Sequence, residues 1–181
     1  MLEQKVPVTT IAIGRKGRDF MVRYGCDMKA EFVQLGDQPP FLDTLPISHI
    51  VIEDYCNGEI DMVYISYAHF ISTMVQKPVM RQLLPVEPAV IPKAENVDYI
   101  YEPHAEAVLG GLLPRFVEME IYHAILESIA SEQSARMVAM KNATESANEL
   151  IGDLTLMYNK ARQEAITTEL LDITGGVSAL T

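Results

Sequence analysis

The most regular hydrophobic pattern of the chain lies between residues 134 and 161. Apolar or small side chains recur there at alternating steps of three and four residues, which is the spacing of the a and d positions of a coiled coil. We call this set the seam: Met140, Ala143, Ala147, Leu150, Leu154, Met157 and Ala161. Alanine at several of these positions allows a second backbone to approach closely, whereas a lone helix gains almost nothing from it. The pattern therefore predicts a partner helix.

The distribution of proline divides the chain into two regions. All ten prolines fall at or before Pro114, and residues 115–181 contain none. The second region therefore predicts one helix from Arg115 to Thr174, about 90 Å long at ~1.5 Å per residue. A compact domain of ~100 residues has a radius of gyration of only about 13 Å. We expect a globular domain over 1–113 and a long coiled-coil helix over 114–181.

Two arrangements of this helix compete. An amphipathic helix can fold back on its own core, or it can stand largely bare until another chain covers it. The length of the helix favours the second arrangement. No second long helix is expected in residues 1–114, so the partner of the seam is not expected within the chain.

The first region indicates alternating strands and helices. Strands with parallel pairing are expected at 8–14 and 61–70, and a helix between them at 46–58 has Pro46 near its start and Gly58 as its end. An edge strand or an extended segment is expected at 77–86, followed by a proline-rich connection that contains the short strand 97–101. The predicted fold class is α/β: a small Rossmann-like three-layer domain plus one very long C-terminal α-helix, half of an antiparallel coiled coil.

Composition excludes several classes of protein. A net charge of −11 and a pI near 4.7 argue against a nucleic-acid-binding protein, which needs a basic face. Cys26 and Cys56 lack a CxxC spacing and fit a reducing compartment. The sequence has no apolar run of membrane-spanning length and no signal-peptide pattern at its start. These features predict a soluble, cytoplasm-like protein.

No group of residues forms a catalytic or metal-binding motif. The basic stretch GRKGR (14–18) lacks the spacing of a phosphate-binding loop and is interpreted as a basic turn. The histidines at positions 49, 69, 104 and 123 share no metal-ligand spacing. We therefore expect no catalytic residue, no cofactor and no metal.

Longer stretches of the second region resemble a known family. SEQSARMVAMKNATESANELI (131–151) and LMYNKARQEAITTELLDITGG (156–176) resemble the C-terminal helix of the gamma subunit of F-type ATP synthases. The family's terminal pattern is met by Ile166, Thr167, Glu169, Asp172 and Gly176, whereas Val177 stands where the family usually has alanine. IGRKGRDF (13–20) and QLLPV (82–86) are similar to the globular part of the family.

The resemblance implies a function. Gamma subunits form the central-stalk rotor, which transmits torque between a proton-driven ring in the membrane and the catalytic ring of alpha and beta subunits. It implies that Arg162, Gln163 and Thr167 contact a beta subunit. Tyr101 and Glu102 would face the membrane ring (the c-ring) and the epsilon subunit. The subunit itself would be non-catalytic and would lie, as a peripheral protein, at the cytoplasmic face of the bacterial cell membrane.

The resemblance covers roughly the last two thirds of a gamma subunit. The family begins with a long N-terminal helix that pairs antiparallel with the C-terminal helix, and with a first strand followed by a glycine-rich turn. The expected partner of the seam is therefore this N-terminal gamma helix, and Met1 is expected to be the start of a truncated gene.

Two other classes of protein remain open from the residues alone. A homodimeric coiled-coil adaptor would use the alanine-containing seam against a second copy of itself. A Rossmann-like nucleotide-binding enzyme with a helical tail would need a glycine-rich turn after its first strand, and that turn is absent from the sequence.

Overall fold

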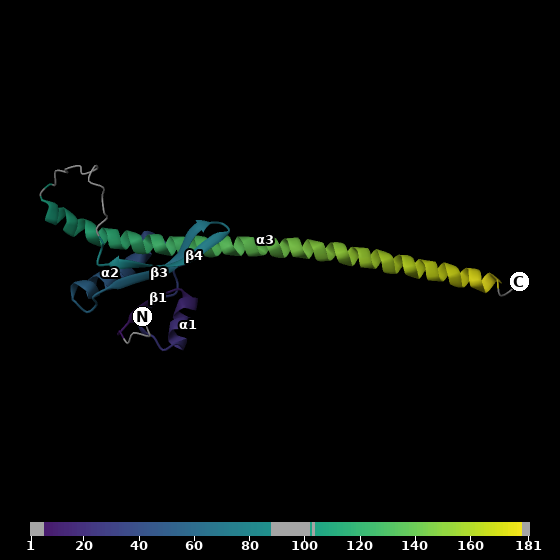
Figure 1. Ribbon diagram of the computed structural model, residues 1–181, viewed down its shortest axis with the longest axis horizontal. Coiled ribbons are helices and arrows are strands. Elements are labelled where there is room, and N and C mark those ends of the chain that lie inside the picture. Colours follow the sequence, from purple (N-terminus) through teal and green to yellow (C-terminus); the bar gives the residue numbers. More distant parts are fainter. Residues whose placement is uncertain (1–5, 88–101, 103, 179–181) are drawn as a thin grey trace. The chain divides into compact units, whose positions relative to one another are not determined.

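The computed structural model describes residues 6–87, 102 and 104–178, with side chains described as far as residue 174. Four strands and three helices follow one another along these residues (Figure 1). Their order is β1 (Thr9–Ile13), α1 (Arg15–Arg23), β2 (Asp27–Phe32), α2 (Phe41–Cys56), β3 (Val63–Ser72), β4 (Val75–Leu84) and α3 (Ala105–Ser178). The fold is α/β with one very long C-terminal helix, which confirms the predicted class.

The first strands and α1 form a compact β-α-β unit. β1 and β2 pair in parallel, from Thr9 opposite Asp27 to Ile13 opposite Phe32. The Gly14 N–H donates to the carbonyl of Phe32 at 2.8 Å and so joins the carboxyl ends of the two strands. Gly14 has φ +93°, which favours glycine, and the chain turns there directly into α1. Residues 14–18 therefore begin a helix and are not the basic turn that the sequence indicated.

The second sheet is the hairpin formed by β3 and β4. The structure confirms strands close to the expected ranges 8–14, 61–70 and 77–86, but the expected parallel pairing of 8–14 with 61–70 is wrong. β1 pairs with β2, and β3 pairs with β4, so the described residues hold two separate two-stranded sheets. A two-residue connection between β3 and β4 imposes this hairpin pairing.

Helix α2 begins earlier than expected. It starts at Phe41, so Pro46 lies inside the helix and not near its start. Proline lacks the N–H that would bond the preceding turn. The helix nevertheless continues through Pro46, and side chains on both sides of it are buried, among them Thr44 and Ile47. The buried side chains of Thr44 and Ser48 donate to carbonyls of their own helix, at 2.7 Å to Phe41 and 2.9 Å to Leu45.

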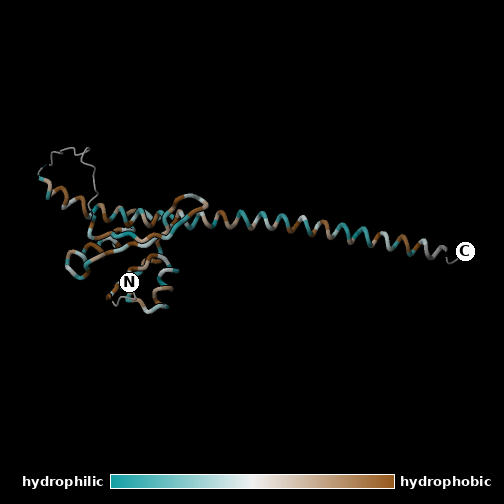
Figure 2. Tube along the Cα trace, in the orientation of Figure 1, coloured by the Kyte–Doolittle hydropathy of each residue, from teal (hydrophilic) through white to brown (hydrophobic). Residues whose placement is uncertain are grey.

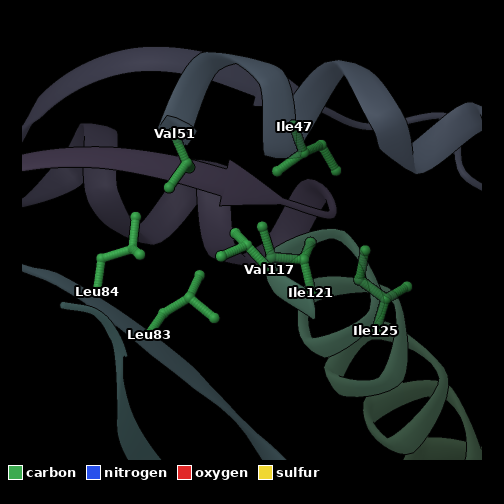
Figure 3. Packing of buried hydrophobic residues seen from close by; sticks show 7 residues of the cluster. All are labelled: Ile47, Val51, Leu83, Leu84, Val117, Ile121 and Ile125. Atoms are coloured by element: carbon green, nitrogen blue, oxygen red, sulfur yellow. The ribbon is translucent and has the colours of Figure 1, made fainter. Parts of the chain in front are cut away.

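One hydrophobic core joins α2, β4 and the first part of α3 (Figure 3). The close-up shows that its side chains converge from the two helices and from the end of β4. The seven buried members are Ile47, Val51, Leu83, Leu84, Val117, Ile121 and Ile125. Val117 and Ile121 are each only 2% exposed, which places this part of α3 among the most buried segments of the chain.

The chain divides into two compact units. The first unit comprises residues 1–71 and 76–131, and the second comprises residues 72–75 and 132–181. The expected domain boundary between residues 113 and 114 falls inside α3, because this helix already begins at Ala105 and contains Pro114. Helix α3 is continuous as far as Ser178, which confirms the unbroken helix expected between Arg115 and Thr174.

Candidate functional site

The seam lies entirely on the exposed part of α3. Every side chain from residue 139 to residue 174 is exposed, and hydrophobic and hydrophilic residues alternate along this stretch (Figure 2). The large seam residues are exposed by 64% at Met140, 59% at Leu150, 55% at Leu154 and 68% at Met157. A globular core leaves few such residues bare in a row. The seam is therefore an apolar surface that no described residue of the chain covers.

Sequence reasoning missed apolar residues beside the seam. Ile151 and Tyr158 follow d-position residues directly, at the e positions of the same heptads, and are 62% and 66% exposed. Leu171 continues the seam at the next d position after a polar gap and is 64% exposed. The alternating steps continued past Ala161 would have pointed to Leu171, and the flanking e positions would have pointed to the other two residues. The apolar face is wider and longer than the seam alone.

The polar residues near the end of the helix form a group of their own. Gln163 and Thr167 lie one turn apart, and the Thr167 hydroxyl donates to the carbonyl of Gln163 at 2.8 Å. Both line a shallow hollow together with Lys160, Glu164 and Thr168. Arg162 is exposed on the same turn but does not line this hollow. The structure thus brings Gln163 and Thr167 together and leaves Arg162 beside them.

The second predicted contact site is only partly described. Tyr101 lies outside the described residues, and Glu102 is exposed. The contact by this pair stays a prediction.

Polar side chains of α3 bind the backbone of β3 within the first unit. Ser128 Oγ accepts the N–H of Ala68 at 3.3 Å, and Ser131 Oγ donates to the carbonyl of Ala68 at 2.9 Å. The Glu127 carboxylate accepts the N–H of Phe70 at 3.3 Å. We call these three residues of α3 the β3 clamp. It satisfies backbone groups that an exposed strand edge would otherwise leave open to other chains.

The groups around Glu127 favour the ionised form of its carboxyl. Its Oε2 lies 2.5 Å from Nδ1 of His69, and its Oε1 lies 3.5 Å from Nδ1 of His123. Burial opposes ionisation of this carboxyl, but the hydrogen bonds from His69 and the Phe70 N–H, together with the two imidazoles, hold the pKa of Glu127 below its ordinary value. The clamp therefore contains a carboxylate that stays ionised.

Two features are absent from the described residues. Within them, no group of three or more histidine, cysteine, aspartate or glutamate residues could hold a metal ion. Over the same residues, no helix combines the length and the apolar character needed to cross a bilayer. What the described residues present is a long surface suited to contact with other helices.

Fold and surface together define a class of protein: an α/β domain that carries a long coiled-coil helix for contact with other chains. A family model described as ATP synthase matches residues 1–180. The chain is 64% identical over 180 residues to the ATP synthase gamma chain of Dehalococcoides mccartyi, and 53% identical over 178 residues to that of Roseiflexus sp.. The chain belongs to the family of ATP synthase gamma chains.

Coverage differs between the chain and its relatives. The Dehalococcoides match covers 99% of this chain but 63% of the relative, and the Roseiflexus match covers 98% and 61%. The chain thus spans less than two thirds of the length of these curated relatives. Because the chain belongs to the gamma-chain family, it is assigned neither to the coiled-coil adaptors nor to the nucleotide-binding enzymes that the sequence had left open.

Solved structures agree with the fold. A chain in the central stalk and c-ring structure of the Tetrahymena thermophila mitochondrial ATP synthase is similar with a TM-score of 0.54 at 25% identity, over 73% of this chain and 58% of that one. A chain of the Euglena gracilis mitochondrial ATP synthase gives a TM-score of 0.60 at 21% identity, over 99% and 64%. The second similarity shows the fold alone.

Proposed function

We propose that the chain acts as the gamma subunit in the central-stalk rotor of an F-type ATP synthase. In this role it transmits torque between the proton-driven ring in the membrane and the catalytic ring of alpha and beta subunits. The observation that carries the proposal is helix α3: its first part is packed into a hydrophobic core, and the same continuous helix then keeps every side chain exposed from residue 139 to residue 174. A rotor subunit that transmits torque needs an unbroken helix and a surface that other chains can bind.

The chain itself is non-catalytic in this proposal. Synthesis and hydrolysis of ATP take place on the alpha and beta subunits, and the rotor contributes stiffness and an asymmetric surface. Stiffness comes from pairing the seam with a second helix, for which the family's N-terminal gamma helix is the proposed partner. The assembled complex holds the chain, as a peripheral protein, at the cytoplasmic face of the bacterial cell membrane.

Two contact sites follow from the family motifs. Arg162, Gln163 and Thr167 are proposed to bind a loop of a beta subunit, because a guanidinium can hold a carboxylate with two parallel hydrogen bonds. The exposure of Arg162, Gln163 and Thr167 on α3 supports this assignment, since all three are accessible to another chain. Tyr101 and Glu102 are proposed to contact the epsilon subunit and the membrane ring.

The test is a double substitution in the assembled ATP synthase. Arg162→Leu with Gln163→Leu should reduce ATP synthesis and alter rotation-linked hydrolysis while assembly is retained. Losing one partner of a desolvated charged pair costs about 2–5 kcal/mol, enough to slow the affected step at least tenfold.

The matched control is Lys141→Leu with Asn142→Leu. This pair also combines a cation with an amide on the exposed part of the same helix. It should leave synthesis and hydrolysis close to wild type. If the assembled Arg162 and Gln163 double variant also behaved as wild type, the beta-subunit contact would be wrong. If complexes containing the chain made no ATP at all, the proposed function would fail.

A further inference from the structure

The apolar face of α3 carries a charge pattern that specifies a particular second helix. The face consists of the seam with Ile151, Tyr158 and Leu171, all exposed. Two charges of opposite sign flank this face at g positions one heptad apart, Asp153 and Lys160. A helix that pairs with the face is therefore favoured if it places a cation beside Asp153 and an anion beside Lys160.

We propose that, when no other helix occupies this face, a second copy of the chain covers it as an antiparallel two-fold pair centred between Leu154 and Met157. The proposal is independent of the rotor function, since it concerns the free chain. It needs only the exposed face and the charges that flank it.

Coiled-coil geometry leaves few registers to choose from. In an antiparallel pair, each a position lies level with a d position of the other helix, so neighbouring registers differ by one heptad. With the centre between Leu154 and Met157, Leu154 packs against Met157 of the second copy. In the same register Leu150 meets Ala161 of the second copy, and Met140 meets Leu171 of the second copy. Large side chains thus face either another large apolar side chain or an alanine that leaves room for them.

The charges select this register. Antiparallel helices bring their g positions together beside the core, and Asp153 and Lys160 are both g positions. In the proposed register Asp153 lies beside Lys160 of the second copy, and the two-fold axis repeats the pair. Sliding one helix along the other by one heptad in either direction would place Asp153 beside Asp153, or Lys160 beside Lys160. Both shifts create like-charge contacts.

The flanking charges also favour the antiparallel orientation over a parallel one. In a parallel pair in register each g position lies beside an e position of the second copy, so Asp153 would meet Tyr158 and Lys160 would meet Ala165. Neither charge would gain an oppositely charged partner, whereas the antiparallel pair gives a partner to both. The two polar core positions are tolerated, since Glu164 and Thr168 face Ala147 and Ala143 of the second copy, whose short side chains leave them a path to solvent.

Charge reversal tests the register. The association of the free 181-residue chain would be measured by sedimentation equilibrium at low salt, for the wild type, for Asp153→Lys, for Lys160→Asp and for the double exchange. The wild type should form a dimer. Each single reversal converts two attractive flanking contacts into two repulsive ones, and exposed pairs of this kind together change the dissociation constant about tenfold. The double exchange should restore wild-type association, and added salt should weaken the effect.

Cross-linking tests the orientation. In a background with Cys26→Ser and Cys56→Ser, a chain with Leu154→Cys would be mixed with a chain with Met157→Cys. The antiparallel pair should yield the mixed disulfide in preference to either homodisulfide.

Several results would overturn the proposal. One is a wild-type chain that stays monomeric at concentrations of tens of micromolar. Another is a dimer insensitive to both single reversals, or one that the double exchange fails to restore. Predominant homodisulfides of the single-cysteine chains would indicate a parallel pair and would refute the proposed orientation.

Discussion

Removal of the Ser131 hydroxyl tests whether the β3 clamp holds the long helix to the α/β unit. Ser131 is 3% exposed, and its Oγ donates to the carbonyl of Ala68 at 2.9 Å. In Ser131→Ala this carbonyl of β3 loses its side-chain partner, and a methyl group takes the place of the hydroxyl in a buried position.

Two opposing contributions determine how far Ser131→Ala changes the free energy of unfolding. A buried polar group left without its hydrogen bond costs about 1–3 kcal/mol. Alanine is a better helix former than serine by up to about 0.5 kcal/mol. The net loss in the free energy of unfolding should therefore be about 0.5–2.5 kcal/mol.

The matched control removes a hydroxyl from the exposed part of the same helix. The Thr155 hydroxyl donates only to the carbonyl of Ile151, one turn back, at 2.7 Å. Thr155→Ala should leave stability unchanged or raise it slightly, because alanine favours the helix.

Urea unfolding is best followed by tyrosine fluorescence, since the chain has eight tyrosines and no tryptophan. Amide hydrogen exchange adds a local measure, because the N–H groups of Ala68 and Phe70 are bound by the clamp. Ser131→Ala should accelerate exchange at these two amides more than at the strand β1. If Ser131→Ala were as stable as Thr155→Ala and exchanged at the same rates, the clamp would have no structural role.

Three further predictions concern the same helix. The pKa of Glu127 lies below the ordinary value of 4.5, so its contribution to stability is complete above pH 4.5 and is lost as the pH falls through its lower folded value; urea midpoints of Glu127→Gln should vary less than wild type over this range. Ile121→Ala, at 2% exposure, should cost about 2–5 kcal/mol, whereas Leu156→Ala, at 70% exposure and off the seam, should stay within about 0.5 kcal/mol in the same urea assay. Adding the N-terminal helix of a gamma chain in trans should raise the melting temperature and helicity measured by circular dichroism, and no gain in either would assign the seam to another partner.

The sequence predicted the long helix because its signal is repeated. The absence of proline after Pro114 and the three-four spacing of the seam act over many residues, and α3 follows both. The prediction failed on α1, where Gly17 and a cluster of basic residues obscure a helix of only nine residues. It also missed β2, although Met28, Ala30 and Phe32 alternate with charged residues in the period of a half-buried strand.

The pairing of the strands could not be read from their order alone. The sequence indicated strands near 8–14 and 61–70 with a helix between them, which is the order of a β-α-β unit. The unit that forms instead uses the shorter crossover through α1, because β2 supplies a nearer parallel partner. The candidate site was more predictable than the sheets: the seam depends on periodicity within one helix, whereas sheet pairing depends on residues far apart in the chain.

A change of phase along α3 explains why its seam needs a partner of its own. The buried or partly buried positions of the first part recur at three-four steps through Val117, Ile121, Ala124, Ser128 and Ser131. Continued, this series would pass through residue 142, but the seam passes through Met140. A shift of two residues corresponds to about 200° around an ideal helix. The apolar stripe that packs in the core therefore ends, and a second stripe begins on a different face of the helix. The core that covers the first stripe therefore cannot be lengthened to cover the seam, so the seam needs a partner of its own.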